Sequence, residues 1–263
     1  WSAATEVGFF QLVNHGLDVK LVQSAFALSE AFFALPNDEK ARFPLKKGLN
    51  AGWEFMSQVR PSTRTADQKE SFQITLPHMD DLWPNQTVVP EFQRIMLDFE
   101  YRAWRLGMDV LSCFAERLGF ARDFFTKAHD RSLPDYQSTL RLLHYPPQPG
   151  NPQPGEKGCG AHTDFGGITV LLLDDKPGLQ VWDTKGERWI DANPIPGTFV
   201  VNLGDMIARW TNDRYRSTLH RVVNTSGAER YSVPFFYSGN PDHEVRCLPV
   251  CLQPGDAPRY PVT

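Results

Sequence analysis

The sequence predicts a mainly β fold with helices, in which a mostly helical N-terminal region packs on a C-terminal barrel or double-sheet jelly roll. Two stretches of helical periodicity before residue 137, and many short apolar runs after it, carry this prediction. The chain has 263 residues, 41% of them hydrophobic, which suits one large core better than two small ones. We therefore expect residues 1–137 and 138–263 to form one integrated domain.

The N-terminal region opens with the apolar-aromatic run GFFQLVNHG, which predicts a short strand and a turn at Gly16. Residues 18–35 carry apolar side chains at helical spacing, and a second helix is expected over about 90–119. Between the two, residues 37–80 are polar and rich in glycine and proline. We expect loops with one or two short strands there.

The C-terminal region alternates short apolar runs with Gly, Pro, Asn and Asp. These runs are STLRLLHY, ITVLLLD, LQVWD, RWIDANP, TFVVNLG, HRVVN and YSVPFFYS. Many short strands at near-regular spacing are typical of a barrel or a jelly roll. The Pro/Gly-rich stretch 146–158 is expected to be a long surface loop between two of these strands.

The composition restricts the classes of partner and the cellular compartment that we expect. A net charge of -4 gives no reason to expect nucleic acid or an anionic membrane as partner, and no apolar run reaches the roughly 18 residues of a spanning helix. The sequence has no secretory leader, but it opens inside a structured pattern, which leaves open whether the natural chain begins earlier. Four cysteines without a CxxC pair indicate reduced thiols in a cytoplasmic protein, with a Cys247–Cys251 zinc or disulfide pair as the weaker alternative. We expect a monomer.

A candidate metal site begins with GAHTDFGG. In a strand, His162 and Asp164 face the same side and Thr163 faces away, although an HxD segment also fits a surface turn. Of the other histidines, His220 in STLHRVVN has the strand-like setting of a third ligand, and a buried core histidine is the alternative. Two histidines and one carboxylate with open positions form the facial arrangement of non-haem Fe(II) oxygenases.

A candidate anion site follows in ERYSVPFFYS. Arg230 and Ser232 are two residues apart, so on a strand both face one way and can grip a carboxylate together. Arg230 comes ten residues after His220, about one strand and one turn later. An intraprotein salt bridge is the alternative for a lone arginine. A dicarboxylate that reaches from a metal to Arg230 explains both features.

These motifs resemble the 2-oxoglutarate- and Fe(II)-dependent dioxygenase superfamily, and more narrowly its isopenicillin N synthase-like branch. The matching segments are GFFQLVNHG, GAHTDFGGITVLL, VVNLGDMIARWTNDRYRSTLHRVVN and RYSVPFF. The resemblance implies a double-stranded β-helix (jelly-roll) core with the N-terminal helices packed outside. It implies Fe(II) on His162, Asp164 and His220, and 2-oxoglutarate on Arg230 and Ser232.

Further positions follow from the same resemblance. Tyr145, in RLLHYPP, matches a tyrosine that often contacts the co-substrate, although Leu143 stands where many plant members have asparagine. Asn202 is a candidate pocket residue, whereas Asp205 is expected in a turn of NLGD. The candidate substrate contacts are Phe165, Trp210, Phe236, Arg60 and Asn202. For the three aromatic residues a place in the core is the alternative.

The resemblance implies oxidation of a small organic molecule with O2 and 2-oxoglutarate, and release of succinate and CO2. Hydroxylation is the default outcome, and desaturation and cyclisation use the same chemistry. Three other functions are also compatible with the motifs. The first is an iron oxidase that does not use 2-oxoglutarate, as in isopenicillin N synthase or aminocyclopropane oxidase. The others are a non-catalytic jelly-roll binding protein and a zinc hydrolase with the same ligands.

Overall fold

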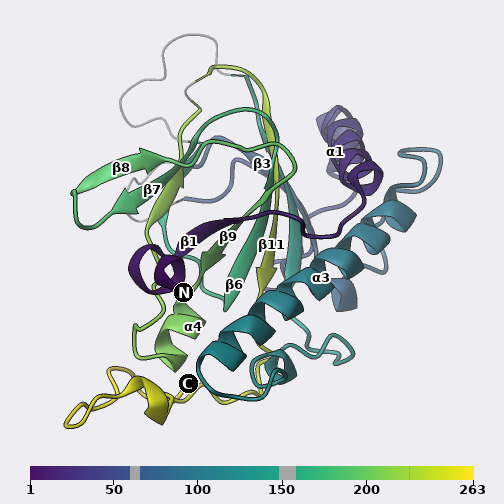
Figure 1. Ribbon diagram of the computed structural model, residues 1–263. Helices are drawn as coiled ribbons and strands as arrows, with labels where there is room; N and C mark the ends of the chain where they lie inside the picture. Colours follow the sequence, from purple (N-terminus) through teal and green to yellow (C-terminus); the bar gives the residue numbers. More distant parts are fainter. Residues whose placement is uncertain (60–65, 148–157, 225) are drawn as a thin grey trace.

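The computed structural model describes residues 1–59, 66–147, 158–224 and 226–263. Two antiparallel sheets form the centre of this described part, one in the order β1-β9-β6-β11-β4-β3-β2 and one in the order β5-β10-β7-β8 (Figure 1). The large sheet contains β1 (Phe9–Leu12), β2 (Gly52–Phe55), β3 (Glu70–Ile74), β4 (Thr139–Tyr145), β6 (Ile168–Leu173), β9 (Phe199–Leu203) and β11 (Arg230–Tyr237). The small sheet contains β5 (Cys159–His162), β7 (Leu179–Asp183), β8 (Arg188–Asp191) and β10 (His220–Val222). Apolar side chains from both sheets share one cluster, so the sheets pack face to face as a jelly roll.

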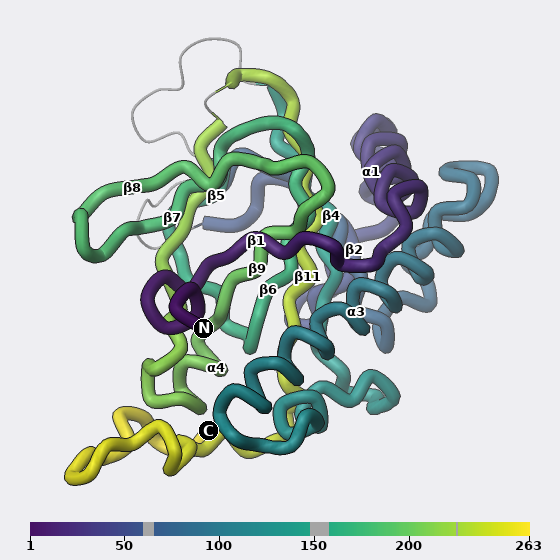
Figure 2. Tube along the Cα trace, viewed as in Figure 1, coloured from purple at the N-terminus to yellow at the C-terminus, as the bar shows by residue number. Residues whose placement is uncertain are grey.

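Two helices cover the outer face of the large sheet. They are α1 (Val19–Phe33) and α3 (Phe92–Arg117), which run beside each other in Figures 1 and 2. Phe32 of α1 is fully buried, with its ring centroid 4.6 Å from that of Phe72 on β3 and 5.6 Å from that of Phe92 on α3. These rings join both helices to the sheet. The two helices expected from the sequence are confirmed.

Side chains along the central strand β11 point alternately to the two faces of the large sheet. Those that join the core beneath the helices are Tyr231, Val233, Phe235 and Tyr237. Those that line a cavity between the two sheets are Arg230, Ser232, Pro234 and Phe236. The cavity therefore lies on the opposite side of the sheet from the helices.

The first 137 residues also supply strands to the large sheet. β1 pairs with β9, with Phe9 opposite Asn202, and β3 pairs with β4, with Gln73 opposite Arg141. Strands from before and after residue 137 are thus joined by main-chain hydrogen bonds. The N-terminal region contributes three strands as well as the two long helices, and it forms one sheet with the C-terminal strands.

The short helices were not predicted from the sequence. α4 (Asp205–Trp210) follows β9 directly, and Asp205 is its first residue, so the expected turn at Asp205 is wrong. Six residues are too few for helical periodicity to show in a sequence. The other short helical pieces are Ala3–Val7, α2 (Asn37–Lys40), Leu76–His78, Thr126–Ala128 and Pro249–Cys251. Residues 148–157 of the expected surface loop lie outside the described residues.

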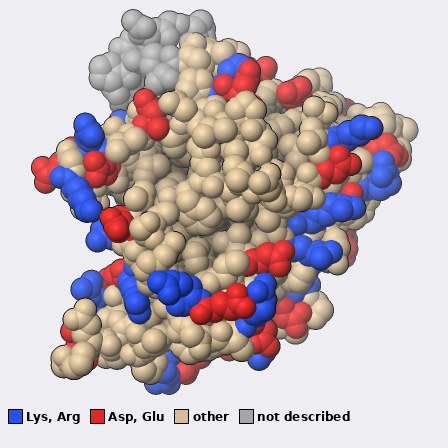
Figure 3. Space-filling view, in the orientation of Figure 1, with Lys and Arg blue, Asp and Glu red and all other residues tan. Residues whose placement is uncertain are grey.

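The surface carries charges of both signs. Figure 3 shows Lys and Arg beside Asp and Glu around the edges and across the lower part of the face in view, whereas other residues fill its centre. Exposed ion pairs lie along α3, such as that of Arg102 with Asp98 at 2.8 Å. Within the described parts of the chain, no helix combines the length and the apolar character needed to cross a membrane.

Candidate active site

The three candidate metal ligands line the cavity between the two sheets. His162 is the last residue of β5 and His220 the first of β10, and the two lie opposite each other in the antiparallel pair. Asp164 lies in the turn after β5, so the expectation that it shares a strand with His162 is wrong. Its main-chain oxygen accepts from the amide of Asp205, which anchors the turn to the start of α4. Gly204 permits this close approach, because a Cβ there would lie 2.2 Å from the oxygen of Gly166.

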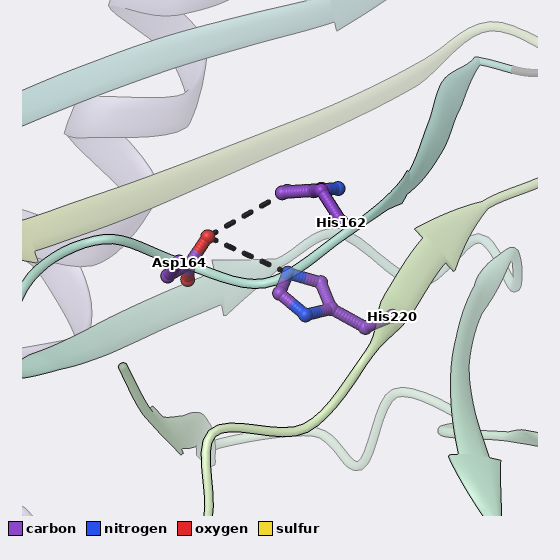
Figure 4. Close-up of side chains that lie close together, drawn as sticks. All are labelled: His162, Asp164 and His220. Carbon is purple, nitrogen blue, oxygen red and sulfur yellow. Dashed lines mark ion pairs between the residues drawn. The ribbon is translucent and has the colours of Figure 1, made fainter. Parts of the chain in front are cut away.

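The three side chains converge on one point, as Figure 4 shows. The Nε2 atoms of His162 and His220 each lie 3.6 Å from Oδ1 of Asp164. One ligand atom from each residue lies within 4.8 Å of the other two. This is the spacing of atoms that can share a metal ion, and two imidazoles with one carboxylate suit iron with open positions.

Neighbouring groups fix the orientation of each ligand. Nδ1 of His162 donates to the main-chain oxygen of Gly160 at 2.8 Å, and Nδ1 of His220 donates to that of Thr218 at 3.1 Å. In each ring the Nε2 atom then faces Asp164. Outer contacts of this kind set the tautomer of metal-binding histidines.

Asp164 is oriented in the same way. Its Oδ2 accepts from Oγ1 of Thr169 at 2.6 Å and from Nδ2 of Asn202 at 2.8 Å, and its Oδ1 faces the two histidines. Burial alone would raise the pKa of Asp164, but the imidazoles of His220 and His162 and these two hydrogen bonds outweigh it and lower the pKa. Burial lowers the pKa of His220, which the Asp164 carboxylate only partly opposes. An ionised carboxylate and a neutral imidazole are the states that bind a metal.

The candidate anion site lines the same cavity as the three candidate ligands. Arg230 is 1% exposed, and its Nε and Nη1 have no hydrogen-bond partner among the described residues. Its guanidinium lies 5.0 Å from the ring centroid of Tyr145, its opposite residue on β4. Ser232 is buried on the same face of β11. A buried guanidinium with donors left over calls for an anion.

The other predicted residues fall into two groups. Asn202 and Phe236 line the cavity together with the three candidate ligands. Phe165 is 68% exposed, and Trp210 packs in the core with its ring centroid 5.3 Å from that of Phe125, so neither lines the cavity. Arg60 lies outside the described residues.

Among the polar residues that line the cavity, four were missed by sequence reasoning: Thr169, Arg141, Lys69 and Cys159. Arg141 stands two and four residues before Leu143 and Tyr145, so period-two alternation from Tyr145 was the available signal. Lys69 lies in a segment interpreted mostly as loop. No disulfide joins cysteines within the described residues.

A jelly roll with two histidines and one carboxylate at the mouth of a cavity, and a buried arginine inside it, defines the class of non-haem iron oxygenases. Family models agree with this class. The model of the 2OG-Fe(II) oxygenase superfamily matches residues 136–239, and that of the N-terminal part of a non-haem dioxygenase in morphine synthesis matches residues 1–90.

Curated relatives agree too. A 2-oxoglutarate-Fe(II) type oxidoreductase of Emericella nidulans is 39% identical, over 97% of this chain and 77% of the relative. A 2-oxoglutarate-dependent dioxygenase of Monascus ruber is 38% identical, over 94% of this chain and 79% of the relative. The chain belongs to the 2-oxoglutarate- and Fe(II)-dependent oxygenase superfamily, and it is an iron- and 2-oxoglutarate-dependent dioxygenase that acts on a small molecule.

Solved structures of such enzymes share the fold. The structure of a full-length Neurospora crassa protein in complex with alpha-KG superposes with a TM-score of 0.87 at 29% identity, covering 99% of this chain and 84% of that one. That of JOX2 in complex with 2OG, Fe and JA gives a TM-score of 0.86 at 29% identity, covering 100% and 76%. The jelly-roll prediction is confirmed.

Proposed function

We propose that His162, Asp164 and His220 hold the Fe(II) ion, and that Arg230 and Ser232 bind the distal carboxylate of 2-oxoglutarate. The convergence of two Nε2 atoms on one carboxylate oxygen supports the metal assignment. The observation that carries the co-substrate assignment is the buried Arg230, whose Nε and Nη1 lack partners among the described residues. A dicarboxylate satisfies these donors through charge-assisted hydrogen bonds, and Tyr145 flanks the guanidinium.

The residues around the metal have distinct tasks in this proposal. When bound, the iron supplies the oxidative chemistry, which hydroxylates the substrate with release of succinate and CO2. Thr169 and Asn202 hold the Asp164 carboxylate in place, as their hydrogen bonds indicate. Phe236 is the predicted substrate contact best placed for the role, because its side chain lines the cavity. Apolar walls there exclude water from the reacting groups.

The test is formation of succinate. Protein purified without oxygen is supplied with Fe(II), 2-oxoglutarate, ascorbate and candidate substrates, including thymine, present in a complex of the Neurospora crassa protein, and JA, present in the JOX2 complex. We expect succinate release that needs both Fe(II) and 2-oxoglutarate, and that disappears in His162→Ala. Substrate turnover without 2-oxoglutarate would instead indicate an oxidase of the isopenicillin N synthase type. Conversion of a substrate with zinc in place of iron, without O2 and without succinate release, would indicate a hydrolase.

We also propose that the enzyme is a cytoplasmic monomer. Four cysteines without a CxxC pair indicate reduced thiols, which supports a cytoplasmic location. Light scattering of the purified protein tests the monomer, and cell fractionation tests the compartment. A dimer in solution, or recovery from a membrane or secreted fraction, contradicts the respective statement.

A further inference from the structure

His144 of β4 lies on the face of the large sheet that is turned away from the candidate anion site. It stands opposite Tyr231 in the pairing of β4 with β11. The next pair along these strands is Tyr145 with Arg230, and both of their side chains line the cavity. Because side chains alternate along a strand, His144 and Tyr231 point the other way, where the ring of His144 lies 5.4 Å from that of Phe33 on α1. His144 is thus directly behind the residues assigned to 2-oxoglutarate.

Both ring nitrogens of His144 contact carboxylates. Nδ1 donates to Oε1 of Glu70 on β3 at 2.7 Å, and Nε2 donates to Oε1 of Glu229 at 2.8 Å. An ionised carboxylate only accepts, so the ring donates from both sides. Burial would raise the pKa of Glu70, but its hydrogen bonds to His144 and Lys40 outweigh this and lower the pKa. A row of alternating charges therefore runs from Lys40 on α2 to Glu229, the residue before Arg230.

His144 contacts both chain neighbours of Arg230. Glu229 precedes Arg230 and forms the ion pair, and Tyr231 follows it and stacks on the imidazole, with ring centroids 4.8 Å apart and an angle of 11° between the planes. The main chain of Tyr231 is held from the other side of β11, because its amide donates to Oδ2 of Asp174 at 2.6 Å. The residues before and after Arg230 are therefore both fixed by side chains outside the cavity.

We infer that His144 is a positioning residue, which aims Arg230 at the distal carboxylate of 2-oxoglutarate by holding the two residues beside it. Arg230 is the first residue of β11, so the hydrogen bonds of the strand continue on one side of it only. A fork of donors binds a carboxylate well only when the residues around it keep it in the right geometry. His144 supplies that support from the opposite face of the sheet. This inference rests on the proposed 2-oxoglutarate site.

Glu229→Ala is the most direct test, because it removes one contact of His144 at the surface. The side chain of Glu229 is 49% exposed, so its loss leaves the buried contact of His144 with Glu70 in place. Binding of 2-oxoglutarate is measured by calorimetry on protein loaded with Fe(II) without oxygen. We expect this affinity to fall by about 3- to 30-fold, the range for side chains that act on a site through a network of contacts. Fe(II) affinity, and succinate formation at saturating 2-oxoglutarate, stay unchanged.

Two further variants separate this contact from general effects. Glu116→Ala is the matched control, because Glu116 on α3 is 48% exposed and pairs with Arg122 at 3.0 Å, and it leaves 2-oxoglutarate binding unchanged. His144→Phe keeps a flat ring against Tyr231 and removes both carboxylate contacts, so we expect it to weaken 2-oxoglutarate binding at least as much as Glu229→Ala. Together, His144→Phe and Glu229→Ala weaken binding by less than the product of the single losses, because groups that share one contact are not additive.

Three results overturn the inference: an unchanged 2-oxoglutarate affinity in Glu229→Ala, an equal loss of that affinity in Glu116→Ala, or an equal loss of Fe(II) affinity in Glu229→Ala. The first means that the contact does not position Arg230, and the other two mean that the effect is not specific to it. Failure of the proposed function is seen separately, because the wild-type protein then binds no 2-oxoglutarate.

Discussion

The two faces of the large sheet are built from the same strands and differ in almost every other respect. On the face beneath α1 and α3, aromatic rings such as Phe32 and Phe72 pack in a dry core. On the face towards the small sheet, β11 presents Arg230 and Ser232 to a cavity that also holds the three candidate metal ligands. Alternation along β11 thus puts core side chains on one face of the sheet and the side chains of the candidate active site on the other.

The two faces contribute to the free energy of folding with opposite signs. Burial of a large apolar side chain contributes roughly 1.5–3 kcal/mol, so the helix side supplies favourable free energy with each ring. A buried charge such as Arg230, whose Nε and Nη1 lack partners among the described residues, opposes folding until an anion satisfies it. The packed face therefore compensates for the charge buried on the cavity face. Substitutions on the two faces are expected to affect different properties of the enzyme.

The largest effect is expected from His220→Ala on the cavity side. Enzymes commonly accelerate reactions by about a millionfold or more, so loss of a metal ligand is expected to lower kcat/KM by at least about 10⁴-fold. The free energy of unfolding of the metal-free protein changes by about 1 kcal/mol or less, because no helix-side contact is lost. Succinate assays and urea unfolding measure the two quantities. His243→Ala, at an exposed histidine, is the control and keeps its activity.

On the helix side, Phe32→Ala is expected to act in the opposite way. Removal of a fully buried phenylalanine typically lowers the free energy of unfolding by about 3–5 kcal/mol. Succinate formation per folded molecule stays unchanged at low temperature. Val19→Ala, at a position 65% exposed on the same helix, is the control with little effect on unfolding. Loss of activity without loss of stability in Phe32→Ala would contradict the separation of the two faces.

Asn202→Ala tests the support of the metal ligand. Its amide holds Oδ2 of Asp164, and loss of such an outer contact typically weakens metal binding by about 10- to 100-fold. Fe(II) affinity measured without oxygen checks this. Asn37→Ala, at an exposed residue of α2, is expected to leave the affinity unchanged. An unchanged Fe(II) affinity in Asn202→Ala argues against Asp164 as a ligand.

A buried histidine outside the cavity gives a pH-dependent stability. Burial lowers the pKa of His129 to about 4, below its usual 6.5. Because the folded pKa is depressed, the stabilisation is complete above pH 6.5 and is lost as pH falls towards 4. This histidine alone is expected to remove about 2 kcal/mol from the free energy of unfolding between pH 7 and pH 5. Urea unfolding at both values measures it, and His129→Gln shows a correspondingly smaller loss. The same loss in the variant means another group is responsible.

Period-two alternation made much of this arrangement predictable. It correctly placed Arg230 and Ser232 on one face of β11, because strand geometry alone decides that. Trp210 was a poor substrate candidate for the opposite reason: closeness to His220 in sequence says nothing of direction, and α4 turns Trp210 into the core. Alternation from Tyr145 could also have placed Arg141 in the cavity, but its hydrogen bond to Gln73 joins two strands and exists only in the folded sheet.

Arg230 is the residue of the cavity face whose role can be tested most directly. The affinity for 2-oxoglutarate is measured by calorimetry on protein loaded with Fe(II) without oxygen, for the wild type and for Arg230→Met. We predict a loss of about 100-fold in this affinity, with Fe(II) affinity unchanged and unfolding of the metal-free protein no easier than in the wild type. An unchanged affinity for 2-oxoglutarate, or a large loss of stability, would contradict the claim that the cavity face holds a charge kept for its ligand.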